Sequence, residues 1–164
     1  MAYTLTKTND ALSIAEQQYA TAQNKLMFTM FTSCIGVVAK KGDKLTGVHL
    51  VIVGEPPVPG QEGPRFGADA SDVPNVIAKL NLPADAVCVF GCFDVWRHPA
   101  NQVVPAFEKL TGDLSEKVGK SKFFGKGIKM YEQCRKDIGT YVAEIRGEGI
   151  IIRDKANAVL APIL

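Results

Sequence analysis

The chain has 164 residues, of which 46% are hydrophobic and 22% are charged, and its net charge is +2. This length and composition are typical of one soluble domain, residues 1–164, with a sizeable core. The small net charge does not favour nucleic acid or a membrane surface as a partner. No apolar run is long enough to span a bilayer.

The first ten residues are polar and lack the apolar segment of a secretion signal. The spacing of the four cysteines, Cys34, Cys88, Cys92 and Cys134, is not that of a zinc finger. We therefore expect reduced thiols, no metal or other cofactor, and synthesis in the cytoplasm. Secretion, or delivery into a host cell by a route that needs no signal, stays open.

The predicted elements follow in chain order. Asp10, as a cap, and a stretch rich in Ala, Gln and Glu predict a helix over residues 10–25. Two strands, residues 26–41 and 44–53, are predicted on either side of a Gly42-Asp43 turn. A helix from Ser71 or Asp72 to Leu80, a strand over 86–96, a helix over 99–110 and a hairpin over 140–155 complete the pattern. This order predicts an α+β fold with mixed or antiparallel sheets, sandwich-like, flanked by helices.

Two other stretches attract attention. The loop 54–72 holds four of the nine prolines and four of the fifteen glycines. Such a loop is either a surface excursion or a rim over a site. If it is a rim, we expect Arg65 and Phe66 to be its substrate-binding residues. Residues 117–136 carry seven basic residues against one acidic residue. That stretch is either a solvated helix face or a docking patch.

The hairpin geometry brings a thiol and an imidazole to one face of the sheet. With a two-residue loop, Lys41 pairs with Lys44, so His49 lies opposite Gly36 and Cys34 shares its face. Diagonal neighbours of this kind are roughly 7–8 Å apart between backbones, and Gly36 leaves the imidazole room. The two residues can be a nucleophile and its base, or two ordinary buried residues of a sheet.

The residues around this pair resemble a known family. The stretch Thr32-Ser33-Cys34-Ile35-Gly36, followed by Gly47-Val48-His49-Leu50, is similar to the G-S-C-V and G-x-A-H pattern of the chemotaxis glutamine deamidase CheD. The cytotoxic necrotizing factors and a bacterial lethal factor that deamidates a host translation helicase share this Cys–His core. The order of elements over residues 25–155 is also similar. The differences from CheD are more typical of a remote, toxin-like member.

The resemblance implies a CheD-like fold and the activity of a protein-glutamine deamidase. In such an enzyme Cys34 is the nucleophile and His49 is the base, and the substrate is a protein bearing a reactive glutamine. The family's third residue is a threonine six positions before the cysteine, where this chain has Phe28. We assign that role to Thr29, with Thr32 or a main-chain carbonyl as open alternatives. A cysteine peptidase or a transglutaminase-type acyl transferase can use the same pair.

Two further alternatives remain open from the residues themselves. One is a non-catalytic adaptor in which the loop 54–72 and the stretch 117–136 bind a partner. The other is a cysteine-protease constellation of Asp94 and His98, since Asp94 is predicted to share a strand face with Cys92 and Cys88. His98 itself is more typical of a surface or capping histidine.

Overall fold

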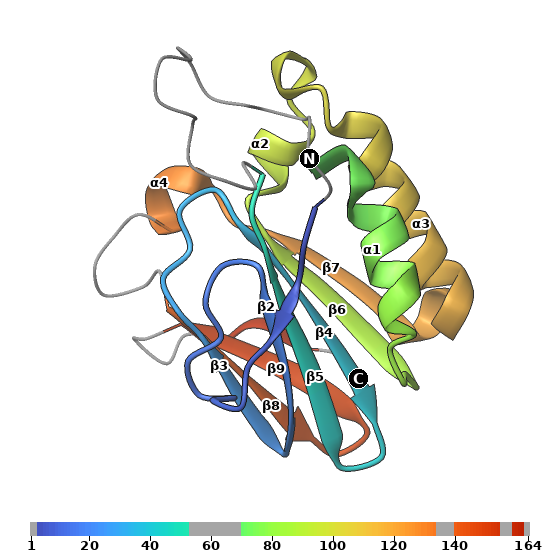
Figure 1. The fold of residues 1–164 in the computed structure, drawn as a ribbon. Helices are drawn as coiled ribbons and strands as arrows, with labels where there is room; N and C mark the ends of the chain where they lie inside the picture. Colours follow the sequence, from blue (N-terminus) through green and yellow to red (C-terminus); the bar gives the residue numbers. More distant parts are fainter. Residues whose placement is uncertain (1–2, 53–69, 134–139, 155–158, 163–164) are drawn as a thin grey trace.

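The computed structural model of the protein describes residues 3–52, 70–133, 140–154 and 159–162 (Figure 1). It confirms the α+β prediction: a mixed sheet and an antiparallel sheet are flanked by helices. Figure 1 shows the helices α1 and α3 side by side along one side of the larger sheet, with the smaller sheet on the other side. No helix in the described ranges is long and apolar enough to cross a membrane.

The larger sheet is mixed and has the strand order β1-β2-β5-β4-β6-β7. Its strands are β1 (Thr6–Lys7), β2 (Gln18–Gln23), β5 (Lys44–Leu50), β4 (Ile35–Lys41), β6 (Ala86–Gly91) and β7 (Phe123–Gly127). The smaller sheet is antiparallel and consists of β10 (Val159–Pro162), β9 (Gly149–Asp154), β8 (Tyr141–Arg146) and β3 (Lys25–Phe28). The helices are α1 (Val73–Leu80), α2 (Phe93–Trp96), α3 (Val104–Val118) and α4 (Met130–Gln133).

The central hairpin has the predicted register. Lys41 pairs with Lys44, and the ladder continues until Ile35 pairs with Leu50. Gly42 takes the positive φ of 61° that a two-residue turn needs at its first position. The carboxylate of Asp85 accepts hydrogen bonds from the Gly42 amide at 3.2 Å and from the Lys41 ammonium at 3.0 Å. The predicted hairpin near the C-terminus is also confirmed, as β8 and β9.

The prediction of one strand over residues 26–41 is wrong, because that stretch contributes to both sheets. β3 pairs with β8 in the smaller sheet, and β4 pairs with β5 and β6 in the larger one. Phe28 and Phe31 have no exposed surface, and both rings pack against Phe90. Burial of these rings between the sheets accounts for the crossing of residues 29–34 from one sheet to the other.

The predicted helix over residues 10–25 is also wrong. Residues 18–23 form β2, which pairs antiparallel with β5. Gln17 and Asn24 take left-handed φ values of 59° and 66°, which interrupt a helix on both sides of this stretch. Pairing with the edge of β5 that β4 leaves uncovered therefore outweighs the helix propensity of Ala and Gln.

Two more boundaries differ from the predictions. The strand predicted over 86–96 ends at Gly91, and residues 93–96 form the short helix α2. Asp94 therefore does not share a strand face with Cys92. The helix predicted over 99–110 is a single 3₁₀ turn, Pro99–Asn101, followed by the longer α3. Gln102, with a left-handed φ of 58°, separates the two.

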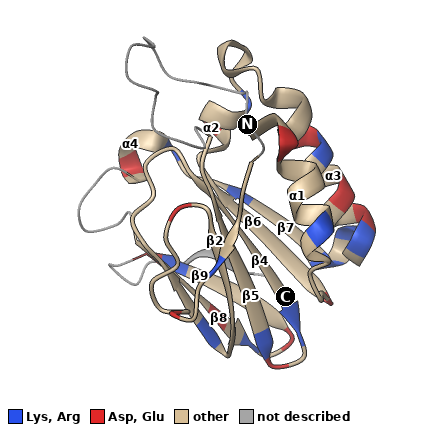
Figure 2. Cartoon of the chain, viewed as in Figure 1, with Lys and Arg blue, Asp and Glu red and all other residues tan. Residues whose placement is uncertain are grey.

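The basic stretch contains an element that the sequence did not reveal. β7 lies parallel to β6 at the edge of the larger sheet, and α4 follows it. Figure 2 shows basic and acidic residues together on α3 and near the turn between β4 and β5, whereas Lys79 is the one charged residue of α1. In the described residues, this stretch is therefore a helix end, an edge strand and a short helix rather than one charged helix face.

Candidate active site

His49 lies in the core between the two sheets. It stands on β5 opposite Gly36 of β4, and none of its surface is exposed. Its ring packs against Phe31 and Phe28, with centroid distances of 4.4 and 6.0 Å. An imidazole in such an aromatic environment loses the water that would hydrate its charged form.

One nitrogen of this imidazole is anchored and the other has no partner. Nδ1 of His49 lies 2.9 Å from the carbonyl oxygen of Ile14. Because a carbonyl only accepts hydrogen bonds, Nδ1 carries the ring proton and donates it. Nε2 therefore holds the basic lone pair, and it is buried without a hydrogen-bond partner in the described part of the chain.

The anchoring carbonyl is itself held in place by backbone hydrogen bonds. The Ile14 amide donates to the Met27 carbonyl at 2.9 Å, and the Thr29 amide donates to the Ile14 carbonyl at 3.0 Å. The Gln17 amide donates to the carbonyl of His49 at 2.9 Å. The segment around Ile14 thus lies against both β3 and β5 and fixes the tilt of the imidazole.

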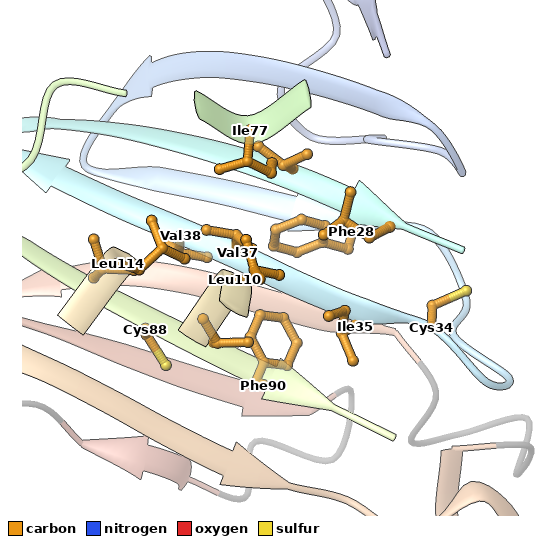
Figure 3. Close-up of a cluster of buried hydrophobic side chains, with 14 of the residues drawn as sticks. Phe28, Cys34, Ile35, Val37, Val38, Ile77, Cys88, Phe90, Leu110 and Leu114 are labelled. Atoms are coloured by element: carbon orange, nitrogen blue, oxygen red, sulfur yellow. The ribbon is translucent and has the colours of Figure 1, made fainter. Parts of the chain in front are cut away.

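Cys34 occupies the residue before β4 and is only 1% exposed. Its carbonyl accepts a hydrogen bond from the Cys92 amide at 3.0 Å. Gly91 has a φ of 132°, and a Cβ at that position would collide with the Cys34 carbonyl, so glycine is required for this close approach. In Figure 3, Cys34 lies at one end of the buried hydrophobic cluster, beyond Ile35.

Burial shifts the pKa values of both groups towards their neutral forms. Desolvation lowers the pKa of His49 from 6.5 to about 4, against the opposing effect of the Ile14 carbonyl. Desolvation also raises the pKa of Cys34 from 9.0 to about 12. The nearby Glu16 carboxylate adds to this rise, while hydrogen bonds with the backbone of Thr32 and Ser33 oppose it. At neutral pH the site therefore holds a thiol and a neutral imidazole.

The structure places His49 on β5 and Cys34 just before the neighbouring strand β4, without a hydrogen bond between them. Cys34 lies two residues before Gly36, the residue that pairs with His49, and Nε2 of His49 bonds to nothing. A Cβ on Gly36 would lie 2.7 Å from the Phe90 ring and 3.1 Å from the Phe31 ring. Gly36 thus makes room for an aromatic stack, whereas the sequence suggested that it makes room for His49.

The predicted third residue is replaced by a backbone atom in this arrangement. Since Nδ1 bonds to Ile14 and Nε2 bonds to nothing, neither Thr29 nor Thr32 bonds to the imidazole through its hydroxyl. Thr29 contributes its amide, which shares the Ile14 carbonyl with the ring. The predicted substrate-binding residues, Arg65 and Phe66, lie outside the described residues.

Two residues that the sequence analysis missed hold the backbone just before Cys34. The indole nitrogen of Trp96 donates to the Ser33 carbonyl at 3.0 Å. The side-chain amide nitrogen of Gln133 donates to the Thr32 carbonyl at 3.3 Å. A buried Trp needs an acceptor for its N–H, so the Trp in the sequence predicts that such a hydrogen bond exists. The sequence does not indicate where the acceptor lies. Nothing in the sequence points to Gln133.

The alternative histidine has a capping role. Nδ1 of the exposed His98 accepts a hydrogen bond from the Ala100 amide at 3.2 Å, at the start of the 3₁₀ turn. Asp94 lies on α2 and is exposed, whereas Cys92 is buried. The structure therefore does not support the predicted strand face on which a second constellation depended.

The described residues hold no group of three or more His, Cys, Asp or Glu side chains placed to bind a metal ion. A search of protein-family models found no match to this chain, and a search of curated proteins found none either. The candidate site therefore stands on its geometry: a buried thiol before β4, and an anchored imidazole on β5 with an unpaired basic nitrogen.

Proposed function

We propose that the protein is a protein-glutamine deamidase that uses Cys34 as nucleophile and His49 as base. The observation that carries the proposal is the state of His49, whose Nδ1 is anchored by the Ile14 carbonyl while its basic Nε2 is unpaired. Buried polar atoms usually have hydrogen-bond partners, and exceptions are found where a group acts chemically. The resemblance around Ser33-Cys34 and His49 gives this arrangement a specific reaction.

The proposed reaction proceeds through a thioester. Sγ of Cys34 attacks the carbonyl carbon of the glutamine side chain while Nε2 of His49 takes the thiol proton. The tetrahedral intermediate then collapses, the C–N bond breaks, and the imidazolium proton leaves with ammonia. Water, deprotonated by Nε2, attacks the thioester carbon, the C–S bond breaks, and the proton returns to sulfur. The products are glutamate and ammonia.

The pKa values of the resting site restrict how the first step occurs. Burial raises the pKa of the Cys34 thiol and lowers the pKa of the His49 imidazole, so burial opposes transfer of a proton from the thiol to the imidazole in the resting site. A thiolate–imidazolium pair therefore does not exist in advance. In the proposed reaction the proton moves as the C–S bond forms, with the substrate amide in the site, and His49 acts as a general base.

The test is mass spectrometry of candidate target proteins after incubation with the purified chain, together with an assay for ammonia. The expected result is the mass gain that accompanies replacement of an amide by a carboxylate, with equal release of ammonia. Cys34→Ser and His49→Gln should abolish both signals. Cys88→Ala, which changes another buried cysteine of the same sheet, should keep them. Full activity of a folded Cys34→Ser variant would sink the proposal.

The same intermediate also serves a peptidase or an acyl transferase. Cleavage of the target backbone would indicate the former, and a new amide bond to an added amine would indicate the latter. In each case the partner is a protein substrate. The chain would encounter this substrate in the cytoplasm, where we expect it to be made, or in a host cell after delivery.

A second candidate function is that of a protein-binding adaptor. Met130 and Tyr131 are 47% and 65% exposed, and they line an open groove of about 630 Å³ together with His98 and Asn101. An adaptor would retain its partner in the Cys34→Ser variant and lose it when Met130 and Tyr131 are both replaced by serine. The deamidase proposal predicts instead that ammonia release is lost in Cys34→Ser and is kept when Met130 and Tyr131 are replaced.

A further inference from the structure

Gln133 is a buried glutamine whose side chain lies beside the backbone of Thr32. It comes from α4, 101 positions later in the chain, and has no exposed surface. Its amide nitrogen donates to the Thr32 carbonyl at 3.3 Å and, in a longer contact, to the Ile128 carbonyl at 3.5 Å. Because both neighbours are acceptors, the nitrogen must face them, and the orientation of the amide is determined.

The oxygen of the same side chain is buried and has no hydrogen-bond partner among the residues that the structure describes. An unpaired buried oxygen destabilises the folded state. An apolar side chain of equal length would fill the same space without this destabilisation. The donors of Gln133, rather than its volume, are therefore what this position uses. The group that receives them belongs to the peptide between Thr32 and Ser33.

Holding two successive carbonyls turns two successive amides. In a trans peptide the N–H points opposite to the C=O. With the Thr32 carbonyl held by Gln133, the Ser33 N–H is directed away from α4. With the Ser33 carbonyl held by Trp96, the Cys34 N–H is directed away from α2. The Ser33 backbone, together with that of Thr32, hydrogen-bonds to the Cys34 thiol and lowers its pKa, so the Ser33 amide is the group that links Gln133 to the sulfur.

We propose that Gln133 is a positioning residue for Cys34: by holding the Thr32 carbonyl, it aims the Ser33 amide of the same peptide at the sulfur, where this amide stabilises negative charge. Its role in turnover rests on the proposed function. Its effect on the thiol does not, because that effect requires no substrate.

The experiment measures the rate at which iodoacetamide modifies Cys34 in the folded, full-length chain, by peptide mapping at mildly alkaline pH. Gln133→Met keeps the length of the side chain and removes its donors. Loss of the aimed amide should slow the modification by about fivefold, the effect of one ordinary hydrogen bond. Gln23→Met, on the exposed surface of β2, is the matched control and should leave the rate unchanged.

The direction of the change separates positioning from simple packing. A residue that only fills space would, when replaced, loosen the site and expose the thiol, so the modification would become faster. An equal or faster rate in Gln133→Met therefore overturns the proposal. Gln133→Leu, which also removes the amide donors, provides a second variant if Gln133→Met does not fold. It should slow the modification too, and an unchanged or faster rate there overturns the proposal.

Failure of this inference and failure of the proposed function give different results. If Cys34→Ser keeps full ammonia release while Gln133→Met slows alkylation, the deamidase proposal falls and the positioning role stands. If the chain is a deamidase, Gln133→Met should lower kcat about fivefold at unchanged KM. A lower kcat together with unchanged alkylation would overturn the positioning role alone.

Discussion

The imidazole of His49 donates its Nδ1 proton to the carbonyl oxygen of Ile14, 35 positions earlier, at 2.9 Å. This bond selects the tautomer in which Nε2 is the base, and burial keeps the ring neutral. Of the three candidates that the sequence left open for this orienting task, Thr29, Thr32 and a main-chain carbonyl, it is a main-chain carbonyl that contacts the imidazole.

Acid should destabilise the protein through His49. Its pKa is 6.5 when unfolded and about 4 when folded, so between these values the unfolded chain binds a proton that the folded chain does not. Stability is therefore complete above the unfolded value and falls as the pH drops towards the folded one. Between about pH 7 and about pH 5 the loss should be about 2 kcal/mol. Urea unfolding at both pH values measures it, and His49→Gln should lose less by about that amount.

The pH dependence of deamidation should distinguish a general base from an ion pair. A neutral imidazole with a pKa of about 4 stays basic throughout the neutral range, so kcat/KM should be flat there and fall only as the pH drops through that value. A thiol with a pKa of about 12 adds no rise near neutrality. Initial rates of ammonia release check this profile. A fall in kcat/KM as the pH rises through the neutral range would instead indicate a pre-formed thiolate–imidazolium pair, because the imidazolium would then lose its proton.

Gly36→Ala should destabilise the protein by about 1–3 kcal/mol because the interior is already full. The new methyl group would lie 2.7 Å from the Phe90 ring and 3.1 Å from the Phe31 ring. Gly112→Ala is the control, since a Cβ there meets no atom within 4 Å on the helix α3. That substitution should stabilise by about 0.5–1 kcal/mol. Chemical denaturation of the two variants measures the opposite signs, and equal effects would contradict this account of Gly36.

Tyr3→Phe should cost about 1–3 kcal/mol, because it leaves two backbone groups of Val51 without their partner. The Tyr3 hydroxyl donates to the Val51 carbonyl at 3.0 Å and accepts from the Val51 amide at 2.8 Å. Tyr131→Phe, at a residue that is 65% exposed, should change stability by less than about 0.5 kcal/mol. Thermal unfolding of both variants tests the contrast. Equal midpoints would show that water replaces the hydroxyl at Val51.

Local rules were sufficient where neighbouring residues decide the structure. The two-residue loop at Gly42-Asp43 and the alternation of strand side chains predict that Gly36 lies opposite His49, and the structure has that register. The helix ending at Leu80 and the C-terminal hairpin were predicted for the same reason. The assignment of catalytic roles to Cys34 and His49 stays a prediction, and Thr29 contacts the Ile14 carbonyl through its amide instead of contacting the imidazole.

Local rules failed where distant segments compete for the same chain. Residues 18–23 have good helix propensity but complete the sheet beside β5, because backbone pairing and burial outweigh a preference of a few tenths of a kcal/mol per residue. β7 is glycine-rich and basic, and only its parallel pairing with β6 makes it a strand. Its strand pattern is too weak to be read from the sequence alone.

The sequence by itself determined the α+β class, the central hairpin, and the placement of an imidazole on one strand with a thiol next to the start of its neighbour, because these depend on loop length and on the two-residue period of a strand. Only the tertiary structure decided that Ile14 holds the imidazole, that aromatic rings fill the space over Gly36, and that Gln133 and Trp96 hold the backbone before Cys34. Each of these contacts joins segments that are distant in the chain. Burial then sets both pKa values, because the free energy of a charge depends on everything packed around it.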